Sequence, residues 1–231
     1  MSKINIYIDG PSENEMKDLF DKDISGFTFN PTLFKSLGVK DYLGYSQKIQ
    51  KLSNGLSISL EVIGDTYEEM VFQGRKLASL GSNVYVKIPI TYTSGKSTID
   101  VIKTLSMEGI NLNITAIFTS LQIKEVLPTL KNTNSIISVF AGRLYDVGID
   151  AKELMKEMSL YIHDNSQCKL LWASPRMHYD VLTAEASNCD IITMTNSMYK
   201  KMSLIGKSPE QYSLETVKMF YDDAIASGFK L

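Results

Sequence analysis

The sequence predicts an α/β protein folded as a closed (β/α)8 barrel, the TIM barrel, and three observations predict it. Eight short apolar runs recur along the 231 residues, and a stretch with helical spacing of apolar residues follows each of them. The runs are continuous rather than alternating, as in strands covered on both faces. Strict alternation of strand and helix indicates a parallel sheet, and eight such units are typical of a barrel of this length. An open doubly wound sheet is the alternative, but no glycine-rich turn follows the first run.

The eight expected strands share an apolar body that ends in polar residues. They are residues 4–9, 26–30, 57–62, 84–90, 112–118, 137–142, 169–174 and 190–195. In a parallel barrel these polar ends meet at one face, so we expect a single pocket there.

The segments between the strands carry helix signals. Residues 12–22 place Met16, Leu19 and Phe20 at helical spacing. Asn30 is a good N-cap, and proline suits the first turn that follows it. The remaining helices are expected at residues 41–52, 65–80, 97–109, 119–132, 151–164, 178–189 and 196–205.

No linker, low-complexity tract or change in composition divides the chain. We therefore expect one barrel domain over residues 1–231, with a C-terminal helical extension over residues 208–231. This extension reads as one amphipathic helix, which is placed either to cross the mouth of the barrel or to pack on a neighbouring subunit.

Composition excludes several classes of protein. A net charge of −2 gives no electrostatic footprint for nucleic acid or an anionic membrane. No apolar run approaches the roughly 20 residues of a transmembrane helix, and the N-terminus lacks a signal-peptide pattern. Cys168 and Cys189 lack metal-ligand spacing and suit a reducing compartment, so we expect a cytoplasmic protein.

The fourth run contains a lysine, Lys87, between apolar neighbours. Burying an ammonium group is costly, so its pKa is expected to fall unless a partner stabilises the charge. A neutral amine near pH 7 attacks carbonyls and forms a Schiff base. The alternative is a structural lysine paired with a buried carboxylate.

Carboxylates and basic residues at other strand ends favour catalysis. Asp9 ends the first run and Glu61 lies late in the third, and two acids in different environments are able to divide the proton-transfer steps of a reaction. Each acid alone is more often a helix cap or a solvated strand end. Arg143, Ser174 and Arg176 end the sixth and seventh runs and form a candidate dianion site, because guanidinium groups donate a planar fork to phosphate oxygens. Taken singly, Arg143 has the alternative of a helix-surface residue.

Two other motifs carry less weight. Residues 94–98 read like the end of a P-loop, but Ile90 stands where the motif needs glycine, so Lys96 is assigned to a loop. His163 and His178 are too few and too scattered for a metal site.

Several motifs together resemble the transaldolase family, in the right order along essentially the whole chain. They are Thr28-Phe29-Asn30-Pro31, Val86-Lys87-Ile88-Pro89, the stretch from Gly109 to Thr115 with Phe118 and Gln122, the stretch from Ile137 to Arg143, and Ala173-Ser174-Pro175-Arg176.

This resemblance implies a Schiff-base aldolase barrel without a metal or organic cofactor, acting on phosphorylated sugars. By motif position, Lys87 would be the nucleophile, Asp9 the acid/base at the scissile bond, and Glu61 the activator of a water ordered by Thr115. Substrate binding would fall to Thr28, Asn30, Asn113, Ser138 and Phe140, and phosphate binding to Arg143, Ser174 and Arg176. Small members of the superfamily often form rings, so a homo-oligomer through the C-terminal helix is implied.

Two branches of the superfamily differ at two positions. The fructose-6-phosphate aldolases carry Gln and Tyr where this chain has Glu61 and Phe140, so both positions resemble transaldolase, although the length is that of the small subfamily. Gly10 and Phe29 depart from the family pattern near the substrate. We therefore expect transfer of a dihydroxyacetone unit between sugar phosphates. Release of free dihydroxyacetone and a non-catalytic sugar-phosphate-binding barrel are the alternatives.

Overall fold

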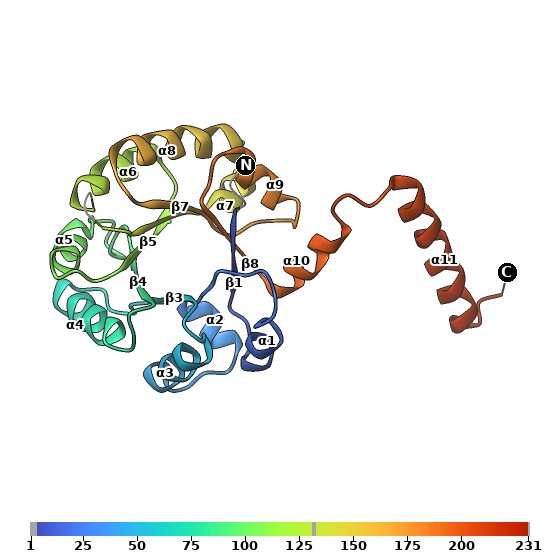
Figure 1. Cartoon of the computed structure of the whole chain (residues 1–231), viewed down its shortest axis with the longest axis horizontal. Helices are drawn as coiled ribbons and strands as arrows, with labels where there is room; N and C mark the ends of the chain where they lie inside the picture. Colours follow the sequence, from blue (N-terminus) through green and yellow to red (C-terminus); the bar gives the residue numbers. More distant parts are fainter. Residues whose placement is uncertain (1–3, 131–132, 231) are drawn as a thin grey trace.

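Eight parallel strands close into a barrel in the computed structural model, which describes residues 4–130 and 133–230. Each strand pairs with its sequence neighbours, and β1 pairs with β8 to close the ring. The predicted (β/α)8 fold is confirmed, with the helices surrounding the strands (Figure 1). The strands are β1 Asn5–Asp9, β2 Gly26–Thr28, β3 Ser57–Glu61, β4 Val84–Pro89, β5 Leu112–Ile117, β6 Ile136–Val139, β7 Lys169–Trp172 and β8 Ile191–Met194.

The helices begin largely where the sequence carries N-cap residues. Ser12, Asn30, Thr66 and Thr119 each accept a hydrogen bond from a backbone N–H of the first turn that follows. The helices are α1 Glu13–Asp18, α2 Pro31–Ser36, α3 Tyr42–Leu52, α4 Tyr67–Ala78, α5 Ile99–Met107, α6 Ser120–Val126, α7 Ala141–Asp146, α8 Ala151–Asn165, α9 Asp180–Ala186, α10 Asn196–Lys201 and α11 Pro209–Ser227, with short 3-10 turns at Leu127–Thr129 and Met202–Leu204.

Helix α7 is the element that the sequence did not predict. We expected a strand over residues 137–142, but β6 ends at Val139 and α7 begins at Ala141. The apolar run continues through Phe140-Ala141-Gly142 without a polar break, so periodicity did not mark the change. Arg143 therefore lies on a helix and not at a strand end. The end of the helix expected at 119–132 falls outside the described residues.

Side chains alternate between two apolar layers along the strands. On β7, Leu170 and Trp172 join the main core between barrel and helices, whereas Leu171 lies in the smaller interior cluster with Tyr7 and Ile191. This alternation sends every second residue of a strand into the barrel, where the polar strand ends meet.

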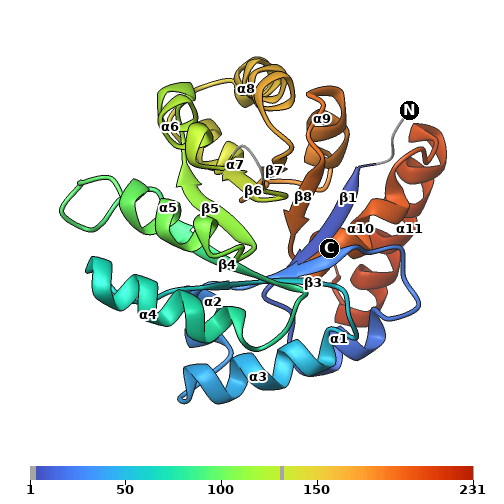
Figure 2. The ribbon, with the colours of Figure 1, turned by 60° about the vertical axis from the view of Figure 1, so that its left-hand side comes forward.

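Helix α11 stands away from the barrel, beyond α10 (Figure 1). Figure 2 shows the barrel turned by 60°, with α4 and α5 on the outside of the strands. None of its residues is buried. Among the described residues, no helix has the combination of length and apolar character needed to span a membrane.

Candidate active site

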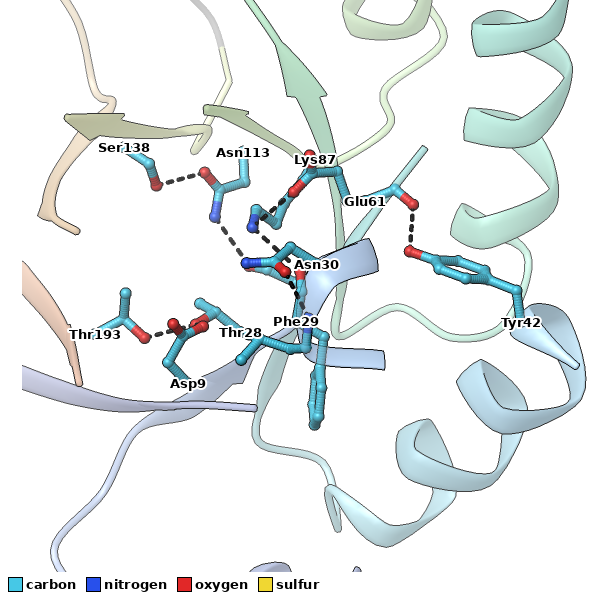
Figure 3. A network of polar contacts seen from close by, with 12 residues as sticks. Asp9, Thr28, Phe29, Asn30, Tyr42, Glu61, Lys87, Asn113, Ser138 and Thr193 are labelled. Carbon is cyan, nitrogen blue, oxygen red and sulfur yellow. Dashed lines mark hydrogen bonds and ion pairs between the residues drawn. The ribbon is translucent and has the colours of Figure 1, made fainter. Parts of the chain in front are cut away.

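One pocket opens at the carboxyl ends of the strands, the face where barrels of this kind hold their active sites. Every residue that the sequence assigned to a site lies in its lining, except Glu61 and Arg176. The lining consists of Asp9, Thr28, Asn30, Lys87, Asn113, Thr115, Ser138, Phe140, Arg143, Ala173, Ser174 and Thr193. Figure 3 shows the polar contacts that join many of them.

Lys87 is buried at the pocket and has two partners. The register of β3 and β4 places Glu61 directly beside it, and its Nζ lies 2.9 Å from Glu61 Oε2. The same Nζ donates to the carbonyl oxygen of Phe29 at 3.1 Å. Lys87 is 5% exposed and the Glu61 side chain 17% exposed, so the ammonium end of this ion pair is shielded from water and the carboxylate end partly so. The pairing also matches the structural alternative considered for this lysine. Glu61 is thus in contact with the pocket through Lys87.

Asp9 lies at the end of a short chain of hydroxyl groups. Thr28 Oγ1 donates to Asp9 Oδ1 at 2.6 Å, and Thr193 Oγ1 lies 2.6 Å from the same Thr28 oxygen. Burial raises the pKa of Asp9 above its usual value, while Lys87 and the Thr28 hydrogen bond act in the opposite direction. An acid with these opposing influences is suited to exchanging a proton with a ligand.

Asn113 is held in one orientation by its two neighbours. Its Nδ2 donates to Ser59 Oγ at 3.0 Å, and its Oδ1 accepts from Ser138 Oγ at 2.6 Å. All three residues are buried. The network fixes which end of the amide faces each neighbour, and so preorganises a polar wall of the pocket.

Thr115 differs from its neighbours because its buried hydroxyl has no hydrogen-bond partner within the described part of the chain. It precedes Ala116, which has a positive φ of 59°, at an irregularity where the register of β5 against β6 shifts. Bulges of this kind often lie beside active sites, where they re-aim side chains. An unpaired buried hydroxyl at a pocket is a site for water or a ligand, since leaving it unsatisfied costs about 1–3 kcal/mol.

The second strand places Asn30 at the pocket and Phe29 away from it. Asn30 Oδ1 accepts from Leu33 N at 2.9 Å, which caps α2 and fixes the amide. The side chain of Phe29 is fully buried and packs edge-on against Phe34, so only its carbonyl reaches Lys87 (Figure 3). The Phe29 side chain, one of the two departures from the family pattern, thus lies away from the pocket.

Gly10, the other departure from the family pattern, adopts a φ of +60°. A Cβ there would lie 2.7 Å from the Leu33 side chain. Its backbone conformation is one that glycine adopts without strain.

Arg143 and Ser174 reach the pocket from adjacent elements. The Arg143 guanidinium lies over the Phe140 ring, 5.2 Å from its centroid. Ser174 comes close because Gly142 has no side chain: a Cβ at Gly142 would lie 1.6 Å from the Ser174 carbonyl oxygen. The glycine thus permits the close approach of α7, which carries Arg143, to the loop after β7, which carries Ser174.

Arg176, the third residue predicted to bind phosphate, lies outside this lining. Its Nε donates to Asp146 Oδ1 at 2.8 Å and its Nη2 to Asp146 Oδ2, a bidentate pair on the exposed surface. The guanidinium holds the pKa of Asp146 below its usual value. The structure thus gives Arg176 a partner on α7 and does not bring it to the pocket with Arg143.

Sequence reasoning missed two residues of this polar network, Ser59 and Thr193. Serine and threonine within apolar runs read as ordinary strand residues. Their position was nevertheless a signal, because Ser59 lies two residues before Glu61 and so shares its inward face. Across residues 4–130 and 133–230, no three His, Cys, Asp or Glu side chains are grouped to hold a metal ion.

The fold and the pocket define a class of proteins, the barrels whose polar groups gather at the carboxyl ends of the strands. Within this class, the family described as transaldolase/fructose-6-phosphate aldolase matches residues 6–230, and the chain belongs to that family. It is 32% identical over 201 residues to a probable transaldolase from Bdellovibrio bacteriovorus, covering 87% of each chain. It is 35% identical over 191 residues to a probable transaldolase from Thermoplasma acidophilum, covering 81% of this chain and 82% of that one.

Solved structures that resemble this one are far more distant in sequence. Dihydrodipicolinate synthase from Rhodopseudomonas palustris superposes with a TM-score of 0.62 at 10% identity, over 96% of this chain and 80% of that one. Deoxyribose phosphate aldolase from Aeropyrum pernix gives a TM-score of 0.58 at 9% identity, over 87% and 90%. At such identities the likeness concerns the barrel fold alone.

Proposed function

We propose that this protein is a transaldolase that moves a dihydroxyacetone unit from a ketose phosphate to an aldose phosphate through a Schiff base on Lys87. The observation that carries the proposal is the buried Lys87 amine at the pocket, 2.9 Å from Glu61. Family membership supports the reaction class. Fructose 6-phosphate and sedoheptulose 7-phosphate are the donors that we expect.

The first step is attack of the Lys87 amine on the ketose carbonyl carbon. An ammonium group has no lone pair, so Nζ must first give up a proton, and Glu61 Oε2 is the adjacent acceptor. The attack forms a carbinolamine, and Glu61 returns the proton to the hydroxyl that leaves as water. Thr115, whose buried hydroxyl has no hydrogen-bond partner among the described residues, is suited to hold this water.

The second step breaks the carbon–carbon bond. Asp9 accepts the proton of the substrate hydroxyl beside the scissile bond, and the bonding electrons move into the iminium to give an enamine. The aldose product leaves, and an acceptor aldehyde takes its place. The enamine then attacks that aldehyde, and Asp9 returns its proton to the new hydroxyl. Water then hydrolyses the resulting iminium by the reverse of the first step, which releases the ketose product and frees Lys87. Thr28, Asn30, Asn113 and Ser138 supply the polar wall that orients the sugar.

The substrate phosphate is assigned to Arg143 and Ser174, which both line the pocket. Arg176 completes this site only if it exchanges Asp146 for the phosphate. The pair is exposed and therefore screened by solvent, so a phosphate dianion competes with the carboxylate for this guanidinium.

The nucleophile is tested by borohydride reduction in the presence of fructose 6-phosphate. We expect the wild-type chain to be trapped with added mass and Lys87→Ala to remain unmodified. Lys96→Ala, at an exposed loop lysine that follows the same strand, is the matched control and is expected to trap normally. Trapping of Lys87→Ala at the wild-type rate would refute the assignment.

The alternative is an aldolase that releases free dihydroxyacetone. Phe140 favours transfer, because a phenyl ring beside Arg143 has no hydroxyl with which to protonate the enamine. Release of dihydroxyacetone is measured with and without an acceptor aldehyde. Fast release of dihydroxyacetone without an acceptor would favour the aldolase. Absence of both borohydride trapping and turnover with a series of ketose phosphates would favour a non-catalytic binding barrel.

A further inference from the structure

Strand β8 contributes a residue to the site that neither the motifs nor the proposed mechanism uses. Thr193 is 5% exposed and lines the pocket opposite Lys87's strand. Its hydroxyl lies 2.6 Å from Thr28 Oγ1, which in turn lies 2.6 Å from Asp9 Oδ1 (Figure 3). The register of β1 with β2 places Asp9 beside Thr28, and the register of β1 with β8 places Thr193 beside Tyr7, two residues before Asp9.

Counting protons fixes the direction of this chain. A threonine hydroxyl has one proton to donate, and an ionised carboxylate only accepts. Thr28 therefore donates a hydrogen bond to Asp9 Oδ1. Because its one hydroxyl proton is engaged in that bond, the contact between the two hydroxyls requires Thr193 to be the donor and Thr28 the acceptor. Because Thr28 is itself only 2% exposed, water does not readily replace Thr193.

The consequence concerns the two oxygens of Asp9. Oδ1 is occupied by the Thr28 hydrogen bond, so a proton from a substrate is accepted on Oδ2. We propose that Thr193 is a positioning residue for proton transfer. By donating a hydrogen bond to Thr28, it keeps the Thr28 hydroxyl directed at Asp9 Oδ1 and leaves Oδ2 to accept the proton of the substrate. The proposal rests on the proposed role of Asp9 as the acid/base.

Without the Thr193 hydroxyl, Thr28 loses the donor that orients it. Its own hydroxyl then turns toward other acceptors in the pocket for part of the time. The ionised Asp9 loses the Thr28 hydrogen bond, which stabilises its charge, for that time. The other charged groups that act on Asp9 are Lys87 on β4 and Glu61 on β3, and neither is altered by a change at position 193. A change at Thr193 therefore tests the effect of the hydroxyl chain on Asp9 without altering any charged group of the site.

The test compares Thr193→Val, which keeps the shape and removes the hydroxyl, with Thr193→Ser, which restores it. The pKa of Asp9 is followed directly by ¹³C NMR of labelled aspartate carboxyls. We expect it to rise in Thr193→Val, because a hydrogen bond to the charged form lowers the pKa of an acid. Thr193→Ser should return it to the wild-type value. Loss of one net hydrogen bond predicts a fall in kcat of about fivefold at the acid end of the profile, with KM little changed.

Thr98→Val is the matched control. Thr98 is also buried and donates to the Pro89 carbonyl at 2.5 Å, but it has no contact with the Asp9 chain. It should lower thermal stability and leave the Asp9 titration unchanged. An Asp9 titration in Thr193→Val that coincides with the wild type would overturn the proposal, as would a serine variant that fails to restore it. Failure of the transaldolase proposal shows separately, as absence of borohydride trapping in the wild type.

Discussion

Asp9 is the residue whose protonation should set the pH dependence of the reaction. Burial raises its pKa above the ordinary value of 3.8, and the nearby Glu61 charge acts in the same direction. As the proton acceptor in cleavage, Asp9 must be ionised. The rate of cleavage should therefore fall as the pH drops through the pKa of Asp9, at a pH above that of an exposed aspartate.

The variant Asp9→Asn checks this role at the residue scale. Losing a general base typically lowers the rate about 10²–10⁴-fold, and the acid limb of the kcat/KM profile should disappear with it. Borohydride trapping of a ketose donor should persist, because the Lys87–Glu61 pair is untouched. Retention of the wild-type acid limb in Asp9→Asn would assign that limb to another group.

At the scale of elements, the site depends on the close approach of α7 to the loop after β7. In Gly142→Ala, the new Cβ would lie 1.6 Å from the Ser174 carbonyl, so the backbone must move. We expect a loss of stability of about 1–3 kcal/mol from the forced fit. We also expect KM to rise more for phosphorylated than for unphosphorylated substrates, because Ser174 moves away from Arg143.

Ala141→Gly is the control for that change, since it lies on the same turn of α7 and is fully buried. It removes a methyl group and displaces no loop, so it should lower the melting temperature without altering the preference for phosphorylated substrates. If Gly142→Ala raised KM equally for phosphorylated and unphosphorylated substrates, α7 would have no role in phosphate binding.

These elements also show what the sequence could and could not predict. The strands were predictable because each is a buried apolar run. Asp9 and Glu61 stood out as charges late in such runs, and Lys87 as a charge inside one. Helix α7 was not, because its first residues continue the apolar run of β6. The pairing of Arg176 with Asp146 was not predictable either, because it joins the loop after β7 to the end of α7, 30 positions away in the sequence, and only the folded barrel brings the two together.

At the scale of the whole molecule, α11 buries none of its residues against the described part of the barrel. One face carries Leu214, Val217, Phe220, Tyr221 and Ile225, and each of them is more than half exposed. Such a stripe normally packs against another surface, because exposed apolar area costs free energy. We therefore propose that α11 packs on a second copy of this chain, as expected for a homo-oligomer formed through the C-terminal helix.

Replacing apolar residues of this stripe with glutamate tests the association. We expect the full chain to sediment as an oligomer and Val217→Glu with Tyr221→Glu to shift it to the monomer, because each buried carboxylate would cost several kcal/mol at the interface. Met219→Glu makes the same kind of change at an exposed residue on the opposite face of the helix, and it should leave the oligomer intact. The barrel of the monomeric variant should melt as a folded unit, since none of the α11 residues contributes to the core. A full chain that sediments as a monomer at every concentration would instead mean that the stripe faces water or a different partner.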